Sequence, residues 1–416
     1  MFGGNLFKRV LCCCSIAVCC CIVCVAVLYY PASVTEGPAH RPVAAPVSVT
    51  QPETTRLVPT TTQPPATTQP PTTAPATQPP STVPPTTKAP DFSYALSALQ
   101  VVPTHTEKYT YEQMQADLQT LCSRYPDQLS LSVFGTSVDG RDLYCVRLGS
   151  SAAQRCILVQ STIHGREYMN TMLTMKLLEY YLYYYDTGFY DGVRYADIFE
   201  DTAVYIVPML NPDGASISQS GLNGLRSEAL RQQVRQIYQQ DTTIDQNEMS
   251  FSEYLRKWKS HANGVDLNRN FAKGFGVQSN HTAPGHEKYQ GPQPESEPET
   301  QSIIRLAASL PGLQGTLSFH SYGSMLYWEC DQTGSYRRLC YNYAQLMRDL
   351  TGYRILGADG VPFMGSFADH VISRGIPNVT IETGNVNTPL PLSEFNRIFA
   401  ETRQTIAAAA VYFASR

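Results

Sequence analysis

The stretch Ser161-Thr-Ile-His-Gly-Arg-Glu-Tyr-Met-Asn170 lies where one kind of hydrophobic pattern gives way to another. The run Cys156–Thr162 is short and apolar, which predicts a buried strand, whereas Met169–Tyr185 repeats its apolar residues at helical spacing. A strand followed directly by a helix is the repeating unit of α/β folds. The turn between them contains His164 and Glu167, and residues three apart at the start of a helix face the same side.

The same alternation of strand and helix patterns continues along the chain after Ser93. It favours an α/β domain with a central, mixed, twisted and largely buried sheet that is flanked by helices. The predicted helices are Tyr111–Tyr125, Met169–Tyr185, Glu299–Leu310, Tyr336–Leu350 and Glu394–Phe413, with a further helix near Leu225–Gln239. The predicted strands are Cys156–Thr162, Ala203–Val207, Thr316–Phe319 and Val379–Ile381. Because there is no internal repeat and no second boundary, we expect residues 93–416 to form a single domain.

The N-terminal part of the chain predicts a membrane anchor. Residues 10–30 contain no charged side chain, and at about 1.5 Å rise per residue such a helix crosses a hydrocarbon layer of about 30 Å. Lys8 and Arg9 precede it, so the positive-inside rule keeps residues 1–9 in the cytoplasm. We therefore expect a single-pass protein of the cell membrane whose folded domain is extracytoplasmic. A cleaved signal peptide is the alternative, although the apolar run exceeds the usual h-region.

Residues 31–92 are dominated by proline, threonine, glutamine and alanine. This composition cannot bury enough apolar surface to fold, and its prolines keep the backbone extended. It predicts a disordered, semi-rigid stalk that holds the domain away from a membrane or within a cell wall. The formal charge of -4, without a local run of lysine and arginine, argues against a nucleic-acid partner.

Three predicted strands lead into histidine or glutamate residues: His164 with Glu167, then His320, then Glu382. Two histidines and one glutamate are a known ligand set for catalytic zinc, with the fourth position left to water. Taken singly, the alternatives are a chance His-x-x-Glu pair, a core histidine at a strand end and a solvated loop carboxylate. Glu382 follows apolar neighbours, so we expect its pKa to be raised, as a general base requires. The joint occurrence of the four residues favours a metal site.

From about Tyr109 to its end, the chain resembles the zinc carboxypeptidase family of carboxypeptidase A type. The first metal motif of that family matches His164-Gly-Arg-Glu167, and its third metal ligand matches the histidine of His320-Ser-Tyr322. The Asn-Arg pair that holds the terminal carboxylate of the substrate matches Asn268-Arg269, and the catalytic glutamate matches Glu382.

This resemblance implies a carboxypeptidase-like fold and the activity of a zinc-dependent metallocarboxypeptidase, a peptide hydrolase. It implies one Zn²⁺ per chain, bound by His164, Glu167 and His320. Glu382 would take a proton from the attacking water and pass it to the leaving amine. Asp266 resembles the family's carboxylate that orients the first zinc histidine, with an ordinary turn aspartate as the alternative.

Cations near the site are harder to assign from the sequence. The family has an arginine after a tryptophan that stabilises the oxyanion, whereas here Lys259 follows Trp258 and Arg256 lies close by. Both cations are candidates for this catalytic role. Arg166 matches a family residue along the substrate groove, and an ordinary surface arginine is the alternative.

The segment Ala358–Asp369 departs from the family pattern in two respects. The family's mobile tyrosine has no match, and Phe363, which lies in this region, cannot donate a hydrogen bond. If Gly365-Ser366 is aligned with the family's Gly-Ser, Phe367 falls where an acidic residue would select basic side chains. A preference for lysine or arginine is then not expected, unless a slip in register brings Asp369 to that position.

The segments Trp258–Phe271 and Thr380–Gly384 look most similar to the bacterial branch of the family, which includes γ-D-glutamyl-diaminopimelate peptidases. The resemblance therefore implies a peptide or a peptidoglycan stem peptide as the substrate, and a stalk that reaches into a cell wall agrees with this. General scavenging of peptides is the alternative among enzymes. A non-catalytic surface-binding protein that keeps the fold is the alternative outside them. We expect the protein to be a monomer.

Overall fold

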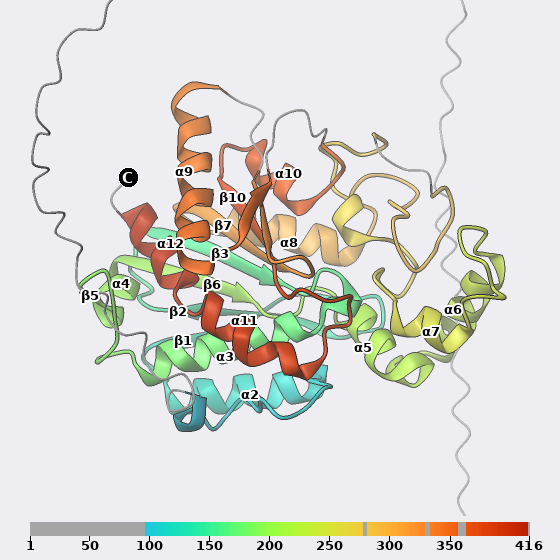
Figure 1. The fold of residues 1–416 in the computed structure, drawn as a ribbon, viewed down its shortest axis with the longest axis horizontal. Helices are drawn as coiled ribbons and strands as arrows, with labels where there is room; N and C mark the ends of the chain where they lie inside the picture. The colour runs from blue at the N-terminus through green and yellow to red at the C-terminus, as the bar shows by residue number, and fades with distance from the viewer. Residues whose placement is uncertain (1–95, 278–280, 329–332, 357–362, 415–416) are drawn as a thin grey trace, which may run out of the picture. The chain divides into compact units, whose positions relative to one another are not determined.

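The computed structural model describes residues 96–277, 281–328, 333–356 and 363–414 (Figure 1). The predicted cytoplasmic segment, anchor and stalk, which together comprise residues 1–92, lie outside the described residues. Within the four described ranges, no helix is both long enough and apolar enough to span a membrane.

A mixed eight-stranded sheet forms the centre of the described domain. In spatial order its strands are β1 (Leu129–Thr136), β2 (Asp142–Leu148), β6 (Thr202–Val207), β3 (Arg155–Ser161), β7 (Leu313–His320), β10 (Asn378–Glu382), β8 (Met325–Trp328) and β9 (Arg354–Leu356). Strands β6, β3, β7 and β10 run parallel to one another. Antiparallel pairing joins β2 to β6 and β8 to β10. The prediction of a mixed sheet is confirmed, and the four predicted strands are its parallel centre.

Helices cover both faces of this sheet (Figure 1). The helices of the described residues are α2 (Tyr111–Arg124), α3 (Met169–Tyr183), α4 (Tyr195–Asp201), α5 (Pro212–Ser220), α6 (Glu228–Gln240), α7 (Phe251–Arg256), α8 (Pro298–Ser309), α9 (Gly334–Thr351), α10 (Phe367–Ile372), α11 (Phe395–Thr402) and α12 (Thr405–Ala414). Apolar side chains of α2, α3, α4, α9, α11 and α12 pack on one face, and those of α8 and α10 on the other. Helices α5, α6 and α7 share a separate apolar cluster around Trp258.

Strand β3 shows how the sequence produces these layers. Ile157 and Val159 belong to the core on one face of the sheet, while Cys156 and Leu158 belong to the core on the other. A strand that is buried on both faces appears in the sequence as a continuous apolar run. Burial on both faces also fixes the register, because a shift by one residue would exchange the two sets of side chains.

One helix prediction is wrong. Residues 394–413 form two helices, α11 and α12, and the break lies at Arg403. The hydroxyl of Tyr181, on α3, donates to the carbonyl of Arg403 and accepts the N–H of Ala407 at 3.2 Å. It therefore bridges two groups that would bond directly in an unbroken helix, and an inserted side chain of this kind interrupts the helix. The other predicted helices agree with the structure to within three residues at each end.

Candidate metal centre and substrate cavity

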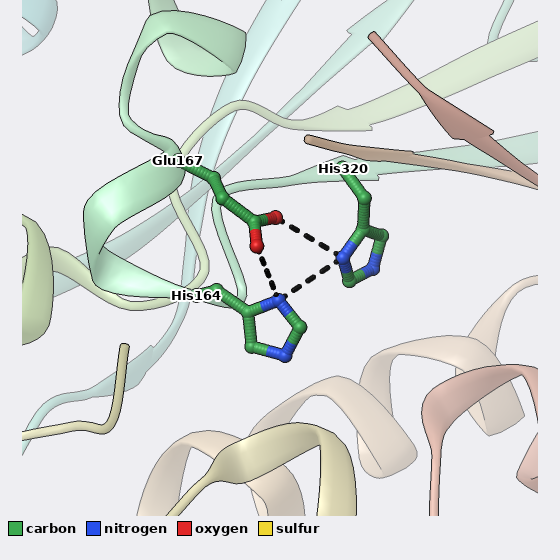
Figure 2. A group of neighbouring side chains, drawn as sticks. All are labelled: His164, Glu167 and His320. Carbon is green, nitrogen blue, oxygen red and sulfur yellow. Dashed lines mark hydrogen bonds and ion pairs between the residues drawn. The ribbon is translucent and has the colours of Figure 1, made fainter. Parts of the chain in front are cut away.

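Three ligand-type side chains meet at the carboxyl edge of the central strands (Figure 2). His164 follows β3, Glu167 lies in the short 3-10 helix η1 (Gly165–Glu167), and His320 is the last residue of β7. Because β3 and β7 are neighbouring parallel strands, their carboxyl ends lie at the same edge of the sheet. The predicted metal ligands are brought together by this pairing.

The ligand atoms of the three residues face one another. His164 Nδ1 lies 2.9 Å from Glu167 Oε1 and 3.1 Å from His320 Nδ1, and His320 Nδ1 lies 3.2 Å from Glu167 Oε2. All three residues are at most 4% exposed. Two imidazole nitrogens and a carboxylate at such separations fit zinc, for which two histidines and a glutamate are an established donor set. Among the described residues, this is the one group of histidine, cysteine, aspartate or glutamate side chains that can hold an ion.

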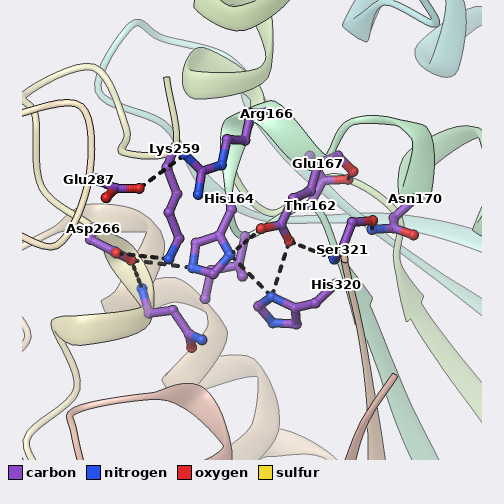
Figure 3. A network of polar contacts seen from close by, with 12 residues as sticks. Thr162, His164, Arg166, Glu167, Asn170, Lys259, Asp266, Glu287, His320 and Ser321 are labelled. Atoms are coloured by element: carbon purple, nitrogen blue, oxygen red, sulfur yellow. Dashed lines mark hydrogen bonds and ion pairs between the residues drawn. The ribbon is translucent and has the colours of Figure 1, made fainter. Parts of the chain in front are cut away.

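The surroundings of these ligands favour a neutral imidazole beside an ionised carboxylate. Burial lowers the pKa of His164 below its ordinary value, which keeps the Nδ1 lone pair available. Burial alone would raise the pKa of Glu167, but the two histidines hold it well below its ordinary value. The backbone N–H of Ser321 donates to Glu167 Oε2 at 3.2 Å, and Asn170 Nδ2 donates to Ser321 Oγ at 3.1 Å (Figure 3). These bonds orient the carboxylate before any metal binds.

Asp266 connects the metal cluster to its neighbours (Figure 3). It is fully buried, and its Oδ1 lies 3.3 Å from His164 Nε2 while its Oδ2 lies 3.4 Å from Lys259 Nζ. The carboxylate also accepts the backbone N–H groups of Asn268 and Lys288, each at 3.1 Å. Although burial opposes ionisation, Lys259 and His164 hold the pKa of Asp266 well below its ordinary value. Asp266 therefore lies beside His164, as expected of a carboxylate that orients the first histidine.

A cavity of about 260 Å³ opens beside the metal cluster, and only one of the two candidate cations lines it. Lys259 lines it, with its ammonium group near Asp266. Arg256, on α7, instead makes two bonds of 2.7 Å with Glu253 and lines a different cavity. The expectation for Arg256 as a catalytic residue is thereby corrected, because the ion pair within α7 holds its guanidinium away from the site.

Asn268 and Arg269 line the same cavity from the 3-10 helix η3 (Leu267–Arg269), at whose start lies Asp266. Asn268 Oδ1 accepts the backbone N–H of Phe367 at 3.0 Å, which leaves the Nδ2 amide as a donor. Arg269 Nη1 donates to the carbonyl of Asn268 at 2.7 Å and holds the guanidinium beside that amide. Two adjacent donors, one of them charged, suit a carboxylate.

Glu382 is the last residue of β10 and lies opposite His320 in the parallel register of β7 and β10. It is half-buried and lines the cavity together with both histidines. Burial raises the pKa of Glu382 to about 7. A carboxylate in this environment can hold or release a proton near neutral pH, which agrees with the expectation from the sequence.

Arg166 lies at the side of the site rather than among the residues that line the cavity. Its Nη1 is 3.0 Å from Glu287 Oε2 and donates to the carbonyl of Lys257 at 3.4 Å (Figure 3). This ion pair gives the arginine a fixed position beside the cleft.

Helix α10 determines which of the two residues, Phe367 or Asp369, lines the cavity. Phe367 lines the cavity and is 1% exposed. Asp369 Oδ2 accepts the backbone N–H groups of Met364 and Ser366 at 2.9 and 2.8 Å, as part of the capping box that begins the helix. Oδ2 of Asp369 is thus occupied by the backbone, and Asp369 is not among the residues that line the cavity.

Several lining residues were not predicted from the sequence. They are Ser318, Tyr327, Met364, Ser366, Ala368 and Thr380. Ser318 and Thr380 precede His320 and Glu382 by two residues on their strands. Because side chains alternate along a strand, the period of two was a signal that placed these hydroxyls on the face of the catalytic residues.

Comparison with known proteins agrees with this geometry. The model of the family described as zinc carboxypeptidase matches residues 114–402. The γ-D-glutamyl-L-diamino acid endopeptidase 1 of Lysinibacillus sphaericus is 26% identical over 302 residues, which cover 71% of this chain and 70% of that protein.

Two solved structures support the fold. The thrombin-activatable fibrinolysis inhibitor has a TM-score of 0.59 at 18% identity, and carboxypeptidase A from Helicoverpa armigera has a TM-score of 0.56 at 19% identity. Each match covers 78% of this chain and 80% of the other. The carboxypeptidase-like α/β fold is therefore confirmed.

The metal centre predicts that zinc binds to the protein and stabilises it. The purified protein is expected to bind about one zinc ion per chain, and saturating zinc at about 1,000 times its dissociation constant stabilises a fold by about 4 kcal/mol. A chelator should therefore lower the melting temperature, and His320→Ala should abolish both zinc binding and this response. Elemental analysis and thermal unfolding measure the two effects. The exposed His105 supplies a matched control, because His105→Ala should retain full zinc content. A wild-type protein without zinc would contradict the metal centre.

Proposed function

Because this chain belongs to the zinc carboxypeptidase family, we propose that it hydrolyses the C-terminal peptide bond of its substrates. One observation carries this proposal: a single cavity is lined both by the histidines of the metal centre and by the donors of Asn268 and Arg269. When Asn268 and Arg269 hold the free carboxylate of a peptide, they bring its last peptide bond to the metal centre.

The residues of the chain divide the work of catalysis. Arg269 and Asn268 bind the terminal carboxylate and fix the substrate's orientation. His164, Glu167 and His320 would hold zinc, which would supply a Lewis acid for the scissile carbonyl and make water more acidic. Glu382 accepts a proton from the attacking water and transfers it to the leaving amine. Lys259, whose charge lies within the same cavity, stabilises the negative charge that develops on the carbonyl oxygen.

Glu382→Gln tests the general base. The amide cannot accept the proton, so we expect kcat to fall by about 10² to 10⁴ while zinc content is retained. Steady-state kinetics on a chromogenic peptide measure this loss. Glu248 is an exposed glutamate, and Glu248→Gln is expected to keep the wild-type rate.

The pH profile of the wild type has a defined sign. Glu382 must be ionised to accept a proton, so kcat/KM should rise with pH through its pKa. Burial raises that pKa from 4.5 to about 7 in the protein without metal, and the positive charge of zinc opposes the rise. We therefore expect the acidic limb to have its midpoint between these two values. A rate that falls as the pH rises from 5 to about 7 would contradict the role of Glu382.

C-terminal amidation of the substrate tests the role of Arg269. An amidated peptide lacks the anionic group, so wild-type turnover should be lost when a free carboxyl terminus is blocked. Arg269→Lys keeps the charge but loses the bidentate geometry, and kcat/KM on free peptides should fall about 100-fold. Arg348→Lys, on the exposed surface, is the matched control. Equal cleavage of blocked and free peptides would show an endopeptidase instead.

The proposed substrate is a cell-wall stem peptide. Its support is the similarity to the endopeptidase of Lysinibacillus sphaericus, whose name gives γ-D-glutamyl-L-diamino acid as its target. The predicted anchor and stalk agree with it, since they would hold a monomeric, extracytoplasmic enzyme of the cell membrane within reach of a wall. Scavenging of ordinary peptides is the alternative, and a catalytically inactive binding protein is a more distant one.

A pair of substrates separates the wall enzyme from the scavenger. In both peptides the last residue is diaminopimelate, whose side chain carries a carboxylate beside its ammonium group, and it is joined to glutamate either through the γ-carboxyl of D-glutamate or through the α-carboxyl of L-glutamate. We expect kcat/KM to be higher for the γ-D linkage, as measured by release of the free diamino acid. A preference for the α-L linkage would favour scavenging, and loss of both activities in wild-type protein with bound zinc would favour a binding protein.

A further inference from the structure

Three pairs of side chains form a ladder along the face of the sheet that carries the site. In the register of β7 and β10, Thr316 lies opposite Asn378, Ser318 opposite Thr380, and His320 opposite Glu382. The last two pairs line the cavity, whereas Asn378 and Thr316 lie beneath them, 1% and 0% exposed. Part of the cavity wall is thus made of the hydroxyl groups of Ser318 and Thr380, which bond to a buried amide.

The side-chain amide of Asn378 accepts hydrogen bonds through its oxygen and donates one through its nitrogen. Its Oδ1 accepts the hydroxyl protons of Thr316 at 2.8 Å and Ser318 at 3.0 Å. Its Nδ2 donates to Thr380 Oγ1 at 3.1 Å. The Ser318 hydroxyl is therefore occupied as a donor, whereas Thr380 uses its oxygen as an acceptor and keeps its own proton for another partner.

This polar ladder is not explained by packing alone. The intervening residues Leu317, Phe319, Val379 and Ile381 are fully buried in the apolar core on the opposite face. They fix the strands in place without help from the hydroxyls, and buried polar groups stabilise a protein only modestly even when they are all paired. A satisfied buried network also fixes the orientation of its members. Here it holds the Thr380 hydroxyl beside a cavity, where that hydroxyl can meet a ligand.

The position of the substrate, which rests on the proposed function, gives that hydroxyl a partner. With the terminal carboxylate at Arg269 and the scissile bond at the metal centre, the side chain of the released residue enters the rest of the cavity, which includes Thr380, Ser366 and Met364. Among the described residues, Glu382 is the one carboxylate that lines this cavity, and Asp369 does not line it. A cationic side chain would find no carboxylate dedicated to it among the described lining residues.

We propose that Thr380, positioned by Asn378, selects released residues whose side chain ends in a hydrogen-bond acceptor, a carboxylate or a carboxamide. Thr380 is the specificity-determining residue, and Asn378 is a positioning residue that directs its hydroxyl. This deepens the proposed function by naming the side-chain class, and it does not depend on which linkage precedes the released residue.

The test compares peptides that differ only in the last residue, in whichever linkage the enzyme cleaves better. Glutamine and methionine have similar size, but methionine lacks the acceptor oxygen. We expect wild-type kcat/KM to be about tenfold higher for glutamine than for methionine, the value of one hydrogen bond of about 1.4 kcal/mol. Glutamate in the same series shows whether a negative charge adds to this preference, and lysine should be poorer than glutamine.

Variants assign the preference to one hydroxyl. Thr380→Val removes the hydroxyl at nearly constant shape and should lower the glutamine-to-methionine ratio about tenfold, whereas Thr380→Ser keeps the hydroxyl and should retain the ratio. Asn378→Leu should lower the ratio as well. Thr120→Val makes the same substitution on the exposed surface of α2 and should leave the ratio at the wild-type value.

The outcomes distinguish this inference from the function on which it rests. Cleavage of all peptides with an unchanged ratio in Thr380→Val would overturn the role of Thr380 alone. A ratio that falls in Ser318→Ala but not in Thr380→Val would show that Ser318 is the donor, and would overturn the assignment too. If wild-type protein with bound zinc cleaves no peptide at all, the proposed carboxypeptidase activity itself fails.

Discussion

The in-register parallel pairing of β3, β7 and β10 is the constraint on which the site depends. Strand β3 is buried in an apolar core on both faces, whereas β7 and β10 divide their alternate residues between an apolar core and the face that carries the cavity. A shift of β10 by one residue would move Ile381 into the cavity and Glu382 toward the core, at the cost of an exposed apolar surface and a buried charge. The hydrophobic effect therefore does the positioning, and the catalytic side chains gain their geometry from residues that take no part in the chemistry.

Asp266 links three parts of the site through one carboxylate. Its buried carboxylate lies beside His164 and Lys259 and accepts the N–H of Asn268. A charge taken out of water is unfavourable unless it is paired, and here the partners are a metal ligand, the cavity's lysine and the turn that carries the carboxylate-binding residues. Under the proposed function, metal binding, oxyanion stabilisation and substrate orientation are thus coupled through one side chain.

The sequence was most informative where burial is complete. Strands β3 and β6 appear as continuous apolar runs, and β7 and β10 as apolar residues that alternate with polar ones; the metal ligands follow two of these patterns, so both could be predicted. The short or half-exposed strands β1, β8 and β9 lack such a run, because one face or an edge meets solvent. Strand β2 is buried along most of its length, but Asp142 and Arg147 limit its apolar run to four residues. The break between α11 and α12 could not be predicted, since it depends on the hydroxyl of Tyr181 from a distant helix. The choice between Lys259 and Arg256 likewise required the direction of each side chain.

The charges of the cavity bear on how it can discriminate between substrates. Under the proposed function, Lys259, Arg269 and a bound metal ion would favour any peptide with a free carboxylate, whatever its last side chain. Electrostatic attraction of this kind raises affinity uniformly and gives little selectivity. Selection among side chains then falls to neutral groups at fixed positions, because an unpaired polar group in a dry cavity costs more than a matched pair gains. The ladder of hydroxyls and amide beneath the cavity has this character, and it is built on the same strand pairing that aligns His320 with Glu382.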